Sequence, residues 1–84
     1  METNEELRKQ IFEIVEKQIK NNDPPETNIA FNRLVKMGYS DFETKQLLGQ
    51  CVAVEIFNIM KHGIKFDDKR YINNLKQLPN EPIE

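Results

Sequence analysis

The stretch SDFETKQLLGQCVAVEIFNIMKHG, residues 40–63, decides the fold because it predicts one long helix. Ser40 and Glu43 have the spacing of a capping box, in which the serine side chain accepts a hydrogen bond from a free amide of the first turn. Gly63 is the residue type that most readily takes the left-handed conformation that ends a helix. We therefore expect a helix over residues 41–62, with a length of about 33 Å.

Apolar side chains surround this predicted helix almost completely. On a helical wheel Leu48, Val52 and Ile59 define the centre of one face. A helix with so narrow a polar sector is usually the buried centre of a bundle. Gly49 costs roughly 1 kcal/mol relative to alanine inside a helix, so we expect another helix to cross closely there. The other apolar positions are Leu47, Cys51, Val54, Ile56, Phe57 and Met60.

Two amphipathic helices are expected before this stretch, over residues 4–20 and 24–37. Between them lies the run DPP, residues 23–25, which has the chemistry of a helix start. Asp23 offers an oxygen acceptor to the free amides, and the prolines occupy positions whose N–H would be unpaired. Gly38 is expected to end the second helix in a left-handed conformation.

A short helix over residues 68–78 is expected to complete the chain. Asp67 is its predicted N-cap and Pro79 ends it, so that the tail, residues 79–84, is expected to be frayed. The predicted fold class is all-α. It is a single domain over residues 1–84, a compact four-helix bundle with a long central third helix and a short C-terminal helix.

Composition argues against some classes of binding partner and against a catalytic role. The 84 residues include 12 basic and 14 acidic side chains, a net charge of −2 that gives no attraction to nucleic acid or to a membrane surface. No apolar run reaches signal-peptide or transmembrane length, so we expect a cytoplasmic protein. Cys51 has no second cysteine to pair with, and one straight helix would hold it about 16 Å from His62. No cofactor motif is present, and we expect no catalytic role.

Glu55 is a polar residue that lies within the apolar part of this predicted helix. It lies on the wheel among Leu48, Cys51 and Val52, where an ionised carboxylate is costly unless it is paired. A structural ion pair or hydrogen bond is the first interpretation, with a metal or ligand contact as the alternative. The possible partners are Arg33, Arg70 and Tyr71.

Much of the chain resembles an uncharacterised family of small bacterial helical domains. The resemblance rests on EKQ at residues 16–18, PPE at 24–26, RLVKMGYS at 33–40 and the final pattern of Tyr71, Leu75 and Leu78. It covers residues 12–79 and implies a helical fold and a bacterial cytoplasmic setting, without an activity. Glu16, Gln18 and Glu43 match the polar part of the family pattern. Where many members carry histidines, this chain has Phe12, Phe42 and Gln46.

A second resemblance covers RLVKMGYSDFETKQLL, residues 33–48, which is similar to the binding loop of ubiquitin-associated domains. Met37, Gly38 and Tyr39 match that loop, but the following helix lacks the early break that the fold requires. It is therefore a lesser alternative, a peptide-binding module. The simpler interpretation of Met37 and Tyr39 is that they pack the corner between two helices.

Two classes of function remain open from the sequence. The first is a non-catalytic protein-interaction domain that binds a protein partner or forms a homodimer, because the third helix is too apolar for a bundle of this size to cover. Its candidate surface is Met37, Tyr39, Leu47, Val54 and Phe57. The second is a small metal- or ligand-binding protein that uses Glu16, Glu43 or Glu55.

Overall fold

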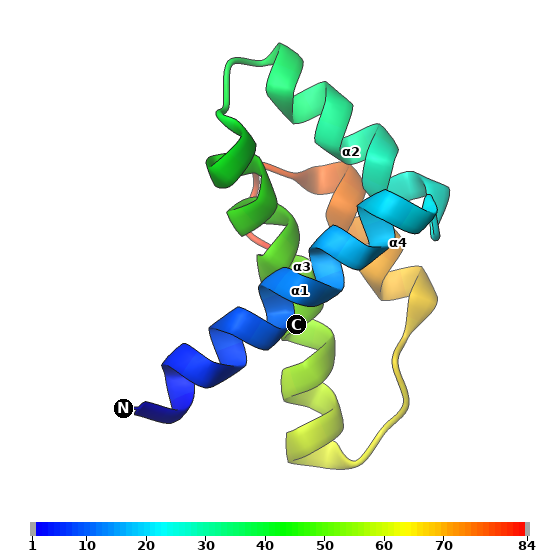
Figure 1. Cartoon of the computed structure of the whole chain (residues 1–84). Helices are drawn as coiled ribbons and strands as arrows, with labels where there is room; N and C mark the ends of the chain where they lie inside the picture. Colours follow the sequence, from blue (N-terminus) through cyan, green and yellow to red (C-terminus); the bar gives the residue numbers. More distant parts are fainter. Residues whose placement is uncertain (1, 84) are drawn as a thin grey trace.

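The computed structural model describes residues 2–83, and these residues form four α-helices and no strand (Figure 1). The predicted all-α class is confirmed, and every predicted helix end lies within two residues of the observed one. The helices are α1 (Glu2–Asn21), α2 (Pro25–Lys36), α3 (Asp41–His62) and α4 (Asp68–Gln77).

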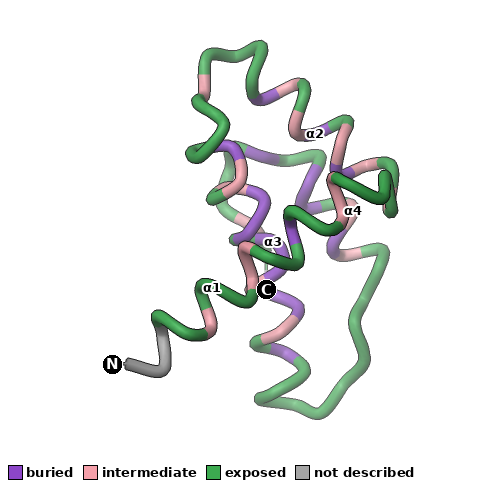
Figure 2. Tube along the Cα trace, in the orientation of Figure 1, coloured by how far each residue is buried: buried purple, intermediate pink, exposed green. Residues whose placement is uncertain are grey.

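The core forms around α3, which packs against each of the other three helices. Leu48, Cys51 and Val52 are fully buried on α3, as the apolar wheel predicted. Figure 2 shows the buried segments of α2, α3 and α4 facing one another. The core cluster consists of Val15, Ala30, Leu34, Leu48, Cys51, Val52, Tyr71, Leu75 and Leu78.

The last turns of α3 are less covered than the sequence predicted. Ile59, which was placed at the centre of the buried face, is 40% exposed, and Met60 is 72% exposed. The connection from α3 to α4 is also exposed along its length, over residues 63–67 (Figure 2). The wheel gives the direction of a side chain but does not show where the neighbouring helices end, so burial along α3 was overestimated.

The start of α2 differs from the prediction in its capping. Pro24 occupies the N-cap position, no side chain caps the free amides, and the helix begins at Pro25. Asp23 is therefore not the cap. The turn is held instead by Asn28, whose side-chain amide donates to the carbonyl of Ile19 and to Oδ1 of Asn22. Asn28 thus ties the first turn of α2 to the end of α1.

The corner between α2 and α3 forms as predicted. Gly38 has φ +109°, a conformation that costs any residue with a Cβ, and it follows the C-cap of α2. The amides of Gly38 and Tyr39 donate to the carbonyls of Val35 and Leu34, which is the Schellman pattern. Ser40 then starts α3 with both hydrogen bonds of the predicted capping box.

The C-terminal tail makes a specific contact with α4, while residue 84 of the expected frayed tail lies outside the described residues. Asp67 caps α4 as predicted, since its side chain accepts from the amide of Arg70. Beyond α4, the buried side chain of Asn74 donates to the carbonyl of Ile83 and accepts from its amide, at 3.0 and 2.9 Å. These two hydrogen bonds attach the backbone of Ile83 to α4.

The predicted close crossing occurs between α1 and α3. Gly49 is buried, and a Cβ added to it would lie 3.2 Å from Cγ2 of Ile11, closer than an ordinary van der Waals contact. A larger residue would push α1 away from α3. Gly49 thus sets the distance between the two longest helices of the chain.

We expect Gly49→Leu to lower the free energy of unfolding by about 2 kcal/mol or more, because the new side chain must displace Ile11. Urea unfolding followed by circular dichroism measures the difference. Gln50→Leu is the matched control, since it adds a similar side chain to an exposed position of the same helix and should change stability by about 0.5 kcal/mol at most. Similar stabilities for both variants would show that the helices do not cross closely at Gly49.

Candidate functional site

Glu55 is completely buried and lies in an ion pair. The guanidinium of Arg70 donates from Nε to Oε2 at 2.6 Å and from its terminal nitrogen to Oε1 at 3.0 Å. The amide of Asp67 also donates to Oε1, at 2.8 Å. The paired interpretation therefore holds for Glu55, with Arg70 as the partner. Charge and hydrogen bonds together compensate the loss of water around the carboxylate.

Arg33, a second candidate partner of Glu55, has a different role. Its guanidinium donates to the carbonyls of Leu78 and Leu75, at 2.6 and 2.9 Å. These carbonyls lie at the C-terminal end of α4, where a positive charge complements the helix dipole. Arg33 therefore joins α2 to α4, and charged side chains hold α4 at both ends.

Gln18 lies at the centre of a polar contact between three helices. Its Oε1 accepts hydrogen bonds from the hydroxyl of Thr27 on α2 and from the hydroxyl of Tyr71 on α4, at 2.7 and 2.6 Å. Thr27 and Tyr71 are buried. Gln18 therefore has a structural role, because the contact satisfies two buried hydroxyls.

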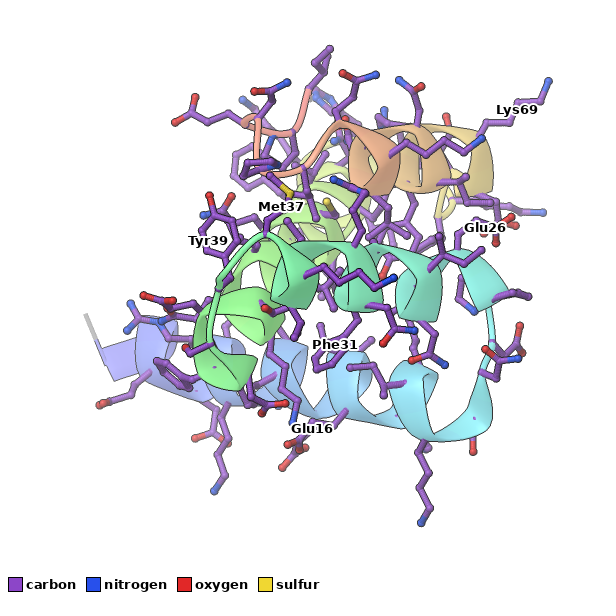
Figure 3. All side chains as sticks on the ribbon, turned by 90° about the horizontal axis from the view of Figure 1, so that it is seen from above. Glu16, Glu26, Phe31, Met37, Tyr39 and Lys69 are labelled. Carbon is purple, nitrogen blue, oxygen red and sulfur yellow. The ribbon has the colours of Figure 1, made fainter. Side chains whose placement is uncertain are left out.

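The remaining acidic candidates make separate surface contacts. Glu43 accepts from the amide of Ser40 in the capping box. Glu16 extends into solvent from α1 and pairs with Lys45 of α3 at 3.4 Å (Figure 3). Among the described residues, no group of three His, Cys, Asp or Glu side chains is placed to hold a metal ion. Glu16, Glu43 and Glu55 therefore do not form a common site.

The proposed interaction surface is only partly exposed. Met37 and Phe57 are 55% and 49% exposed, and Tyr39 is half-buried near the end of α2 (Figure 3). Val54 is buried, and Leu47 packs against the core. The prediction for Val54 was wrong, because an almost uniformly apolar wheel does not show which sides of α3 are covered, whereas Leu47, like Tyr39, is partly buried. The five residues thus do not form one exposed surface.

A groove lies between α1 and α3 on the described surface. Its volume is about 850 Å³. Phe12 of α1 and Phe42 of α3 form an aromatic pair in it, with ring centroids 5.7 Å apart, and Phe42 is 60% exposed. On the α3 side the groove is lined by Gly49, which Ile11 approaches closely, and by the small side chain of Ala53. The groove residues are Glu5, Leu7, Arg8, Lys9, Ile11, Phe12, Glu13, Glu16, Phe42, Lys45, Gln46, Gly49, Gln50 and Ala53.

Sequence reasoning missed this groove although a signal was present. One face of the helical wheel, at the edge of its narrow polar sector, carries Phe42, Gln46, Gly49 and Ala53. A large aromatic followed by small residues on one face predicts a hollow beside a ridge. Phe12 on α1 completes it, and only the helix crossing brings the two phenylalanines together.

Two buried groups of the core have strongly raised pKa values. Burial raises the pKa of the Cys51 thiol to about 12, and the nearby charge of Glu55 adds to the effect. Burial also raises the pKa of the Tyr71 hydroxyl to about 12. The folded protein therefore keeps both groups protonated, and Cys51 has the character of an inert core residue rather than a nucleophile.

Glu55→Gln is expected to lower the free energy of unfolding by about 1 to 3 kcal/mol near neutral pH. The carboxamide would turn an N–H group toward the donors of Arg70 and would remove its counterion. Urea unfolding is the measurement. Glu16→Gln is the control, because it removes a solvent-exposed ion pair and should cost less than about 1 kcal/mol. If both variants lose the same small amount of free energy of unfolding, the buried ion pair does not stabilise the fold.

Because the pKa values of Cys51 and Tyr71 are raised by folding, we expect the free energy of unfolding to fall in alkaline solution. The pKa values of Cys51 and Tyr71 are higher in the folded chain than the ordinary values of about 8.5 and 10, so the unfolded chain loses these protons first. Their contribution is complete below about pH 8 and is lost as the pH rises toward 12. Each group lowers stability by at most about 1.4 kcal/mol per pH unit.

Urea unfolding at a series of pH values from about 8 to about 11 tests this prediction. Cys51→Ala removes one of the two shifted groups, so its stability should fall less steeply with pH than that of the wild type. The comparison cancels the titration of the lysines, which both proteins share. Parallel pH profiles would contradict a thiol whose ionisation opposes folding.

No family model, curated protein or solved structure matches the chain. The two family resemblances drawn from the sequence therefore remain predictions. The uninterrupted course of α3 from Asp41 to His62 speaks against the ubiquitin-associated alternative, which requires a break soon after Leu48. Function has to be argued from the surface of this chain.

Proposed function

We propose that this chain is a non-catalytic protein-interaction domain that binds a helix in the groove between α1 and α3. The observation that supports the proposal is the contact of half-buried Phe12 with exposed Phe42 in a groove of about 850 Å³. An exposed apolar depression bordered by charged residues is typical of a contact surface. The charged border keeps the surface hydrated until the partner covers the apolar floor.

The dimensions of the groove favour a helical occupant. Its residues extend from Glu5 to Glu16 on α1 and from Phe42 to Ala53 on α3. Each segment covers about three helical turns, or about 16 Å. A helix of that length would place apolar residues on one face against Phe12 and Phe42, the helix-in-groove mode of recognition. Binding would also cover Phe42, whose ring is otherwise largely in water.

The acidic residues considered for a metal or ligand site do not favour that alternative. Glu55 neutralises Arg70 inside the core, and Glu43 caps α3. Glu16 contributes to the border of the groove through its ion pair with Lys45. Each carboxylate thus has a structural role that needs no bound ion.

Site-specific photo-crosslinking in the native cell tests the proposal. We expect a photo-crosslinking amino acid in place of Gln46, an exposed groove residue, to give discrete protein adducts. The same amino acid in place of Asn32, which is exposed on α2 outside the groove, is the control and should give none. Phe42→Ser combined with the Gln46 probe should abolish the adducts, because it removes the exposed aromatic ring.

The fold of each variant is checked by circular dichroism, because a lost adduct is informative only in a folded protein. Equal labelling from Gln46 and Asn32 would indicate random collision. Absence of adducts at Gln46 would mean that no protein occupies the groove. Either result would contradict the proposed function.

A further inference from the structure

We propose that the occupant of the groove is a second copy of this chain, bound through a symmetric contact in which each α1 lies against the groove of the other copy. This inference rests on the proposed function and adds the identity of the partner. In a two-fold contact the same surface serves as ligand and as receptor, so it must complement itself in shape, polarity and charge.

The charges bordering the groove meet this requirement. Three are acidic and three are basic, so the border has no net charge. A strongly acidic or strongly basic partner helix would meet like charges along half of this border. A second copy presents both signs, and rotation by a two-fold axis can bring opposite charges together. The acidic residues are Glu5, Glu13 and Glu16, and the basic residues are Arg8, Lys9 and Lys45.

The shape of the molecule also suits a symmetric contact. The first turns of α1 extend past the body of the bundle (Figure 1). Glu5, Arg8, Lys9 and Glu13 on these turns are exposed, and the groove lies directly beside them. The molecule thus carries a protruding helix next to a hollow. In antiparallel orientation, two copies would pair the charged borders of their α1 helices, while Phe12 and Phe42 of one copy would cover those of the other.

Sedimentation velocity on charge-reversed variants tests the inference. The wild type is expected to shift from its mass of 9.9 kDa toward twice that value between about 1 µM and about 1 mM, a range that covers weak dimers. The double variant Arg8→Glu with Lys9→Glu gives an acidic border, and Glu5→Lys with Glu13→Lys gives a basic one. Each variant alone should stay monomeric over the range in which the wild type dimerises, because identical borders repel.

An equimolar mixture of the acidic and basic variants should restore the dimer, since the two borders then attract each other. Lys17→Glu with Lys20→Glu is the matched control, because both residues are exposed on α1 outside the groove, and this variant should associate like the wild type. All four changed residues of the test variants are exposed, so circular dichroism should show unchanged helix content.

The outcomes separate this inference from the proposed function. A wild type that stays monomeric up to about 1 mM overturns the second copy as partner. Adducts to a different protein from the Gln46 position would then still support the interaction domain. Dimers in the wild type and in both charge-reversed variants would place the contact elsewhere and would overturn this inference. Restoration of the dimer only in the mixture supports it.

Discussion

The ion pair between Glu55 and Arg70 is the interaction on which the rest of the structure depends. A carboxylate without exposed surface in the middle of α3 is tolerable only if its charge and its lone pairs are matched. Arg70 and the amide of Asp67 provide that match, and both belong to the first residues of α4. The burial of one charge on α3 thus fixes where α4 begins. An apolar pair at positions 55 and 70 would fill the same space without selecting this position.

The position of α4 then decides the contacts of the other helices. A helix of 10 residues is too short to be stable in isolation, and α4 is held at its other end by Arg33 of α2. Between these two points Tyr71 reaches across the core to Gln18 of α1, which also accepts from Thr27 of α2. Apolar packing alone allows helices to slide or rotate, whereas these directional bonds specify one arrangement.

The sequence predicts those features that depend on local chemistry. The caps at Ser40 and Asp67 and the close crossing at Gly49 follow from residue type and spacing, as does the need of Glu55 for a partner. The groove and the exposure of Ile59 depend on where separate helices end relative to one another. The residues within one helix do not determine where the other helices end. Val54 was assigned to the surface for the same reason, since the wheel does not say which sides of an almost uniformly apolar helix are covered.

The coverage of α3 also explains why the groove faces solvent. Three other helices pack against α3. The ion pair joins α4 to α3, the Arg33 contact joins α2 to α4, and the Gln18 contact joins α1 to α4. On the α1 side, Gly49 allows close approach to Ile11, and the groove with Phe12 and Phe42 lies between the same two helices. These polar contacts specify the fold, and none of them covers Phe42, which stays largely exposed beside α1.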